Sequence, residues 1–298
     1  MVNDRGLVAE WFWLARPFTL TAAAVPVLFA TALAGAAGAF FWGPFLAMLF
    51  ASLLIQAATN MFNEFYDEQR GLDTTSSVGI AGSIVQGRVR ARDVLIGALF
   101  CYTLALFLGL YLVYVGGWPI LLLGCLSALG GYVYSAGPRP VAYTPASEAT
   151  VFVFMGLVIV IVAYGVQTDS YPLSVPLAAI PIGALVAAIL LANNIRDLES
   201  DRRGGRNTLP VALGRRGGVA VYRGLLLGAY GLAGALAFLN VVSLGALLVL
   251  LSAPLAVRLW RKVVASTVPE RLVPVVKGTA GLHAVFGLLY TVGVLLPL

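Results

Sequence analysis

Nine long apolar runs divide the chain and constrain its fold more than any other feature. They lie at about 18–38, 42–63, 94–115, 118–135, 147–167, 176–197, 219–239, 242–261 and 275–296. A helix needs about 20 apolar residues to cross the hydrocarbon of a bilayer, and continuous rather than alternating runs predict helices. Only 11% of the residues are charged, against about 25% in soluble domains. We therefore predict an all-α integral membrane protein, a single domain over 1–298, with nine transmembrane helices in a bundle around a central cavity.

The basic residues predict how this bundle is oriented. All 19 Lys and Arg fall on one side of the predicted arrangement, whereas the opposite connections carry a single charge, Asp169. The positive-inside rule makes the basic side cytoplasmic, with the N-terminus inside and the C-terminus outside. We expect a multi-pass protein of the cell membrane with its active site on the cytoplasmic side. The net charge of +6 then reflects topology and contact with membrane lipids, and it predicts no nucleic-acid partner.

Two acidic clusters stand at the ends of the second and sixth runs, both on the predicted cytoplasmic side. The first reads Asn60-Met-Phe-Asn63-Glu64-Phe-Tyr-Asp67, followed by Gly71 and Asp73, and the second reads Asn193-Asn194-Ile-Arg196-Asp197-Leu-Glu199-Ser-Asp201. A carboxylate at the membrane centre costs about 2.5–3.5 kcal/mol, and less toward helix ends. Residues three and four apart share a helix face, so each cluster predicts a stripe of oxygen donors. Such donors suit Mg²⁺, which binds few carboxylates together with waters and substrate phosphates.

The acids have a simpler alternative role, which is to pair with nearby arginines in solvated loops. We favour this alternative for Glu68, Asp93 and Glu199. For Asp67, Asp197 and Asp201 we predict a function, because their spacing and their position at the end of a span occur twice.

The two clusters resemble the paired motifs of the UbiA superfamily of intramembrane prenyltransferases. The first resembles N-x-x-N-D-x-x-D-x-x-x-G-x-D, with Glu64 where Asp is usual. The second resembles N-N-x-R-D-x-x-x-D-x-x-x-G-K-R-T-L, with Arg206 for Lys and Asn207 for Arg. Two further segments resemble the branch that makes menaquinone precursors, namely Ala15-Arg16-Pro17 and Tyr134-Ser135-Ala136-Gly137-Pro138.

This resemblance implies transfer of a polyprenyl group from polyprenyl diphosphate to an aromatic acceptor, and the branch suggests 1,4-dihydroxy-2-naphthoate. It implies Mg²⁺ held by Asn63, Asp67, Asp73, Asp197 and Asp201. The catalytic residues that it implies are Asp67, Asp197, Asp201, Glu148 and Tyr134. The substrate-binding residues that it implies are Asn60, Asn63, Glu64, Asp73, Arg16, Arg139, Asn193, Asn194, Arg196 and Arg206.

Several of these residues have individual expected roles. Arg139 and Arg196 are expected to bind phosphate oxygens. Glu148 would orient or deprotonate a ring hydroxyl. Tyr134 is the strongest of several aromatic candidates, Tyr143 among them, for stabilising an allylic cation. Arg16 would bind the carboxylate of the acceptor or, alternatively, anchor a lipid headgroup.

Other functions remain open on the sequence alone. A 4-hydroxybenzoate acceptor is less expected, because the Y-P-x-x-K-R loop of that branch is replaced by Tyr134-Ser-Ala-Gly-Pro-Arg139, and a glycerol-phosphate lipid acceptor is a further possibility. A cation-coupled transporter would place its carboxylates near the midplane on broken helices. A CDP-alcohol phosphotransferase would need a compact D-G-x-x-A-R motif, which the chain lacks.

Overall fold

The computed structural model describes residues 6–71, 82–135 and 140–296, and within these ranges it contains helices and no strand. The α-helices are α1 (Leu7–Leu14), α2 (Thr21–Ala36), α3 (Trp42–Gln69), α4 (Ala91–Ser135), α5 (Ser147–Val151), α6 (Ile159–Thr168), α7 (Ser174–Arg196), α8 (Leu198–Arg203), α9 (Leu209–Phe238), α10 (Ala253–Ala265) and α11 (Pro269–Leu295). Short 3₁₀ segments are η1 (Pro17–Thr19), η2 (Val141–Tyr143) and η4 (Leu244–Ser252), and η3 (Phe152–Val158) is π-helical. The prediction of an all-α protein is confirmed.

Seven of the described helical stretches are long and apolar enough to cross a membrane, and a bent pair makes up to eight. In the bent pair, the α1–η1 segment meets α2 at 55°. The longest helix, α4, has 45 residues and would span about 68 Å if it were straight, more than twice the hydrocarbon thickness of about 30 Å. Gly117 divides it, because its backbone angles of φ 68° and ψ −154° are not helical. The protein is thus a multi-pass membrane protein.

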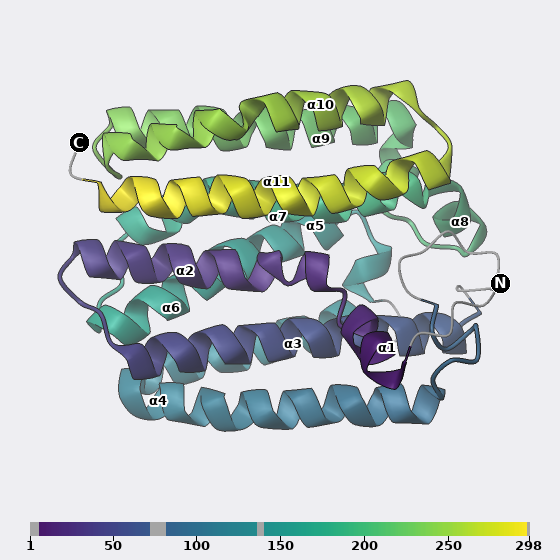
Figure 1. Cartoon of the computed structure of the whole chain (residues 1–298), viewed down its shortest axis with the longest axis horizontal. Helices are drawn as coiled ribbons and strands as arrows, with labels where there is room; N and C mark the ends of the chain where they lie inside the picture. The colour runs from purple at the N-terminus through teal and green to yellow at the C-terminus, as the bar shows by residue number, and fades with distance from the viewer. Residues whose placement is uncertain (1–5, 72–81, 136–139, 297–298) are drawn as a thin grey trace.

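The helices lie side by side, and α7 occupies the centre (Figure 1). Its apolar membrane window is 78% buried within the protein, because it packs against α9, α11 and η3. Figure 1 shows α9 and α10 on one side of this centre and α3 and α4 on the other. The core includes the fully buried Ile182 and Leu185 of α7 and a stacked ring pair, Phe29 and Tyr290, whose centroids are 4.5 Å apart.

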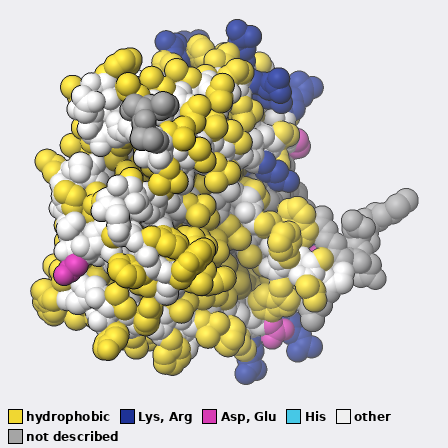
Figure 2. Space-filling view, turned by 60° about the vertical axis from the view of Figure 1, so that its left-hand side comes forward, with side chains coloured by type: hydrophobic (Ala, Val, Ile, Leu, Met, Phe, Trp, Pro, Cys, Tyr) yellow, Lys and Arg dark blue, Asp and Glu magenta, His cyan; other side chains and the backbone are white. Residues whose placement is uncertain are grey.

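The two ends of the bundle differ in charge. The view in Figure 2 brings forward the end at which α11 terminates, and this face is mostly hydrophobic, while Lys and Arg gather along the opposite edge. The hydrophobic end carries exposed aromatic side chains, including Trp42, Tyr114 and Trp118. Aromatic belts of this kind are typical of a membrane–water interface. The charge asymmetry predicted from the sequence is therefore present in the described structure.

Glycines allow two pairs of segments to approach closely. Gly156 of η3 faces Gly183 of α7, and Gly293 of α11 faces the backbone of Gly245 in η4. A Cβ atom at Gly293 would overlap the carbonyl group of Gly245. Small residues at such contacts are how membrane helices achieve close packing in lipid.

We predict that Gly293→Ala lowers stability by about 1–3 kcal/mol, because backbone cannot move aside as a flexible side chain does. Thermal unfolding in detergent measures this. The matched control is Gly228→Ala in α9, where no heavy atom lies within 4 Å of the added Cβ and where Ala favours the helix by about 1 kcal/mol. Equal effects of the two substitutions would contradict the close contact.

Candidate active site

A cavity of about 850 Å³ lies at the end of the bundle where α8 lies. Both acidic clusters contribute to its polar wall, with Asn63 and Asp67 from α3 and Asn193 from α7. Its deeper wall is apolar and is formed by Ala22, Val151, Met155, Val186, Ile189 and Leu190. The cavity therefore combines a charged mouth with an apolar interior, which suits a ligand with an anionic head and an apolar tail.

Arg206 connects the two clusters. Its Nη2 lies 3.2 Å from Asp67 Oδ1, and its Nη1 lies 3.3 Å from Asp201 Oδ1. The guanidinium also covers the Tyr143 ring at 4.3 Å from the ring centre, and the Tyr143 hydroxyl donates to Asp67 Oδ1 at 3.2 Å. One cation thus compensates two carboxylates that are far apart in the sequence.

Asp201 is buried, with 3% of its surface exposed. Besides Arg206, it accepts a hydrogen bond of 3.1 Å from Thr208 Oγ1. Burial raises the pKa of Asp201 to about 6, and the Asp197 charge adds to this effect while Arg206 opposes it. A carboxyl with this pKa is mostly ionised at neutral pH, and the Arg206 charge, which lowers the pKa, favours that ionised form.

Asp197 lies where α7 ends and α8 begins. Arg196 Nε and Nη2 donate to its two carboxylate oxygens at 2.7 and 2.5 Å, and Asn193 Nδ2 donates at 3.4 Å. The fork of Arg196 therefore faces Asp197, its sequence neighbour. Asp197 itself still lines the cavity.

Glu148 of α5 is buried and pairs with two neighbours. Its Oε1 accepts a hydrogen bond from Asn194 Nδ2 and its Oε2 one from Ser147 Oγ, both at 2.9 Å. Asn194 lines the cavity together with Tyr134. The contacts of Glu148 reach the cavity through Asn194, and the acceptor role predicted for Glu148 stays a prediction.

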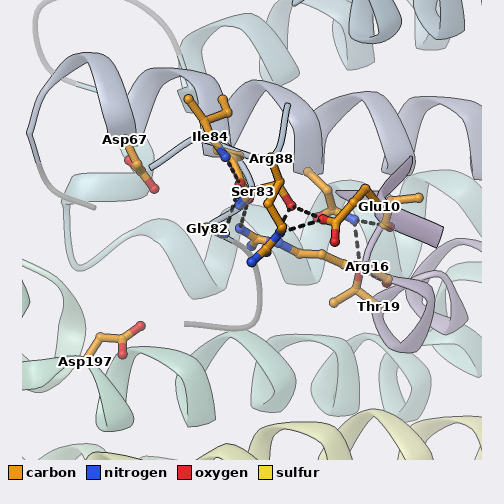
Figure 3. A network of polar contacts seen from close by, with 12 residues as sticks. Glu10, Arg16, Thr19, Asp67, Gly82, Ser83, Ile84, Arg88 and Asp197 are labelled. Atoms are coloured by element: carbon orange, nitrogen blue, oxygen red, sulfur yellow. Dashed lines mark hydrogen bonds and ion pairs between the residues drawn. The ribbon is translucent and has the colours of Figure 1, made fainter. Parts of the chain in front are cut away.

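Two members of the first cluster contact other parts of the chain. Asn60 Nδ2 donates to the Ala15 carbonyl and to Thr19 Oγ1. Glu64 Oε1 accepts hydrogen bonds from the backbone amides of the Gly82–Ile84 turn (Figure 3). In the same view Asp67, on α3, and Asp197, between α7 and α8, lie to the left of this network. Among the predicted site residues, Asp73 and Arg139 lie outside the described residues.

Sequence reasoning missed part of the site. Val85 and Gln86 line the cavity, and Tyr143 contacts both Asp67 and Arg206. Tyr143 was expected only as one of several aromatic faces, and its hydroxyl contact depends on a residue 76 positions away. No local pattern in the sequence carries that information.

The donors present fit a hard divalent cation, although they are not gathered around one. No group of three His, Cys, Asp or Glu in the described part of the chain is arranged to hold a metal. Arg206 already neutralises Asp67 and Asp201. Carboxylate and amide oxygens on facing walls nevertheless match Mg²⁺, which uses few carboxylates and completes its shell with water and phosphate oxygens.

These features define a class, a helical membrane protein with a cavity suited to an amphipathic anion. The profile of the UbiA prenyltransferase family matches residues 23–272. The chain belongs to the UbiA prenyltransferase family, and it is a prenyltransferase enzyme. The resemblance identified from the sequence is confirmed.

The chain is similar to curated relatives over nearly its whole length. It is 41% identical to the 1,4-dihydroxy-2-naphthoate octaprenyltransferase of Bacillus subtilis, covering 95% of this chain and 91% of the relative. It is 31% identical to the protein of that name in Escherichia coli, covering 96% and 95%.

Solved structures share the fold. A UbiA homolog from Aeropyrum pernix, in its apo form, aligns with a TM-score of 0.68 at 18% identity, covering 91% of this chain and 96% of that one. A UbiA homolog from Archaeoglobus fulgidus, bound to GPP and Mg²⁺, aligns with a TM-score of 0.57 at 17% identity, covering 94% and 99%.

We predict that Arg206→Gln increases the affinity for Mn²⁺ alone, by about three- to tenfold, because the metal no longer competes with a guanidinium for Asp67 and Asp201. Mn²⁺ titration followed by electron paramagnetic resonance, without any substrate, measures it. Arg202→Gln is the control, since Arg202 is exposed and pairs with Glu199. An unchanged or weaker affinity in Arg206→Gln would contradict the bridging role.

Proposed function

We propose that this prenyltransferase transfers a polyprenyl group from polyprenyl diphosphate to 1,4-dihydroxy-2-naphthoate, a step of menaquinone biosynthesis. The observation that carries the proposal is the meeting of both acidic clusters and Arg206 at the mouth of one apolar cavity. The names of the relatives support the choice of acceptor. A 4-hydroxybenzoate or glycerol-phosphate acceptor is the competing outcome of the assay described below.

We assign the binding of Mg²⁺ to Asn63, Asp67, Asp197 and Asp201, together with Asp73 from the sequence motif. When bound, the cation supplies the positive charge that stabilises a departing diphosphate. The assignment of these residues rests on the two acidic motifs and on the position of Asp67, Asp197 and Asp201 at the cavity. The structure of the archaeal homolog bound to GPP and Mg²⁺ supports Mg²⁺ as the cofactor.

The chain's own residues bind and orient the prenyl diphosphate. Arg206 exchanges its carboxylate partners for phosphate oxygens, to which a guanidinium binds in a bidentate manner. Arg196 holds Asp197 in position through its own fork. The apolar wall receives the prenyl tail and excludes water from the reacting carbon.

Aromatic and polar groups act on the allylic cation that remains when diphosphate leaves, and on the acceptor that attacks it. The Tyr134 ring, at the cavity wall, stabilises the allylic cation through its π-face. Asn193 and Asn194 are assigned to substrate binding at the same wall. Glu148 fixes Asn194 through its hydrogen bond of 2.9 Å, and in this way it positions the hydroxyl of the acceptor.

We also propose a topology of nine spans within one domain over 1–298. The eight spans that include the bent pair become nine when α4 is divided at Gly117. The basic end of the bundle is then cytoplasmic by the positive-inside rule. The N-terminus then lies on the cytoplasmic side of the cell membrane, and the active site opens to the cytoplasm.

We predict Mg²⁺-dependent prenylation of 1,4-dihydroxy-2-naphthoate, and none of 4-hydroxybenzoate, by the purified protein in detergent. The assay supplies a long-chain prenyl diphosphate with each acceptor and measures both diphosphate release and the prenylated product. Product with hydroxybenzoate alone, or only with a glycerol-phosphate lipid, would reject the acceptor. A protein that neither binds nor cleaves prenyl diphosphate would reject prenyl transfer and favour transport.

We predict that Asp67→Asn reduces turnover by at least about a hundredfold, comparable to removing a preorganised charge-stabilising group, while thermal stability is retained. The same loss is expected for Asp197→Asn and Asp201→Asn. The control is Glu68→Gln, which changes the adjacent acid in the same helix and contacts Gln69. A full-rate Asp67→Asn enzyme, or an equal loss in Glu68→Gln, would contradict the assignment.

A further inference from the structure

Arg16 has a backbone conformation that L-residues rarely adopt. Its angles are φ 50° and ψ 68°, in the left-handed region, and it separates α1 from η1. Such a conformation persists only where the surroundings enforce it, and it is often found at functional sites. The side chain of Arg16 lines the cavity.

Asn60 holds the backbone on both sides of Arg16. Its Nδ2 donates to the Ala15 carbonyl at 2.8 Å and to Thr19 Oγ1 at 2.9 Å. Thr19 Oγ1 in turn donates to the Arg16 carbonyl at 2.9 Å. Asn60 Oδ1 accepts a hydrogen bond of 3.3 Å from Gln56 Nε2. Both polar atoms of the Asn60 side chain therefore have partners within the chain, although a role in substrate binding was expected.

Glu64 fixes the Gly82–Ile84 turn, which leads into the part of the cavity wall that lies beside Arg16. Its Oε1 accepts hydrogen bonds of 2.9, 2.6 and 3.3 Å from the amides of Gly82, Ser83 and Ile84. The residue is 2% exposed, so the amides replace water around its charge. Val85 and Gln86, which follow this turn, line the cavity.

A second glutamate secures the turn from its other side. Ser83 Oγ donates to Glu10 Oε2 at 2.9 Å, and Arg88 Nε lies 3.0 Å from the same oxygen. Figure 3 shows these contacts beside Arg16. The turn is thus tied to both α1 and α3.

The guanidinium of Arg16 is held only loosely. Its Nη2 lies 4.0 Å from Glu64 Oε2, and its buried Nε has no hydrogen-bond partner. Glu64 Oε2 also has no hydrogen-bond partner. The ion pair therefore orients the side chain without using its bidentate fork, and the donors remain for a planar anion.

We propose that Arg16 is the subsite for the carboxylate of the aromatic acceptor, and that Asn60 and Glu64 are positioning residues for it rather than ligands of metal or diphosphate. This proposal rests on the proposed function, because it places the second anionic substrate in the same cavity. The diphosphate is assigned to the Asp67, Asp197 and Arg206 side. The acceptor carboxylate is a second anion in the same cavity and needs a cation of its own. Arg16 supplies that cation.

The test compares two ligands that differ only in the carboxylate, 1-hydroxy-2-naphthoate and 1-naphthol, by calorimetric titration of the whole protein in detergent. The wild type is expected to bind the carboxylate ligand more tightly by about ten- to a hundredfold, the range for a charge-assisted hydrogen bond. In Arg16→Gln this preference disappears, while 1-naphthol binding is unchanged. Arg16→Lys keeps the charge without the fork and retains an intermediate preference.

The control variant is Arg202→Gln, which keeps the full preference. Equal binding of both ligands by the wild type would overturn the proposal. So would an Arg16→Gln variant that weakens both ligands equally, which indicates a structural role alone. Should Arg16→Gln not fold, Arg16→Lys gives the same decision through its reduced preference.

Glu64→Gln separates positioning from metal binding. It is expected to reduce the carboxylate preference while Mn²⁺ affinity stays within about twofold of the wild type, since no ligand of the metal is lost. Asp67→Asn, one helical turn away, is expected to lose Mn²⁺ affinity. A comparable loss in Glu64→Gln would overturn the assignment of Glu64.

These binding measurements are independent of turnover. A wild type that prenylates only another acceptor, yet shows the Arg16-dependent preference, keeps the subsite and rejects the proposed acceptor. A wild type that prenylates dihydroxynaphthoate without this preference keeps the proposed acceptor and rejects the Arg16 subsite.

Discussion

Charge compensation of carboxylates at the edge of a membrane is the constraint on which this site depends. Asp67 and Asp201 belong to segments more than a hundred residues apart, and Arg206 neutralises both. Tyr143 supports the arrangement, with its ring beneath the guanidinium and its hydroxyl on Asp67. Unpaired carboxylates so close to hydrocarbon would be costly. In the proposed mechanism a cation takes over these carboxylate oxygens, and Arg206 is released to bind the diphosphate.

The fold places this polar cluster at the mouth of an apolar cavity, which suits a substrate with a long apolar tail. The central helix α7 is apolar and buried along most of its length, and it ends at Arg196, next to Asp197 in the cavity wall. The apolar interior and the charged mouth are therefore two parts of one helix and its neighbours. The first acidic cluster serves two purposes, because Asp67 faces the second cluster while Asn60 and Glu64 bind the turns around Arg16. A motif with regular helical spacing does not require a single role for all its members.

Much of the fold could be predicted from the sequence, because each transmembrane helix needs an apolar run long enough to cross the hydrocarbon layer. The break at Gly117 was predicted, because the apolar runs 94–115 and 118–135 are separate in the sequence. The placement of both acidic clusters on one side of the membrane followed from the predicted topology. The partners of Glu64 could not be predicted, because the Gly82–Ile84 amides reach it only through tertiary packing. Tyr143 was missed as a partner of Asp67 for the same reason. Contacts between distant loops carry no periodic signal in a single sequence.

The central claim is that metal and diphosphate replace Arg206 between the two acidic clusters. A structure with Mn²⁺ and geranyl diphosphate, in which anomalous scattering locates the metal, tests it most directly. We predict Mn²⁺ in contact with Asp67 on one side and with Asp197 or Asp201 on the other, with Arg206 turned from Asp67 to the diphosphate. Mn²⁺ that contacts neither cluster, or an Arg206 that still joins Asp67 to Asp201 beside bound substrate, would contradict the account.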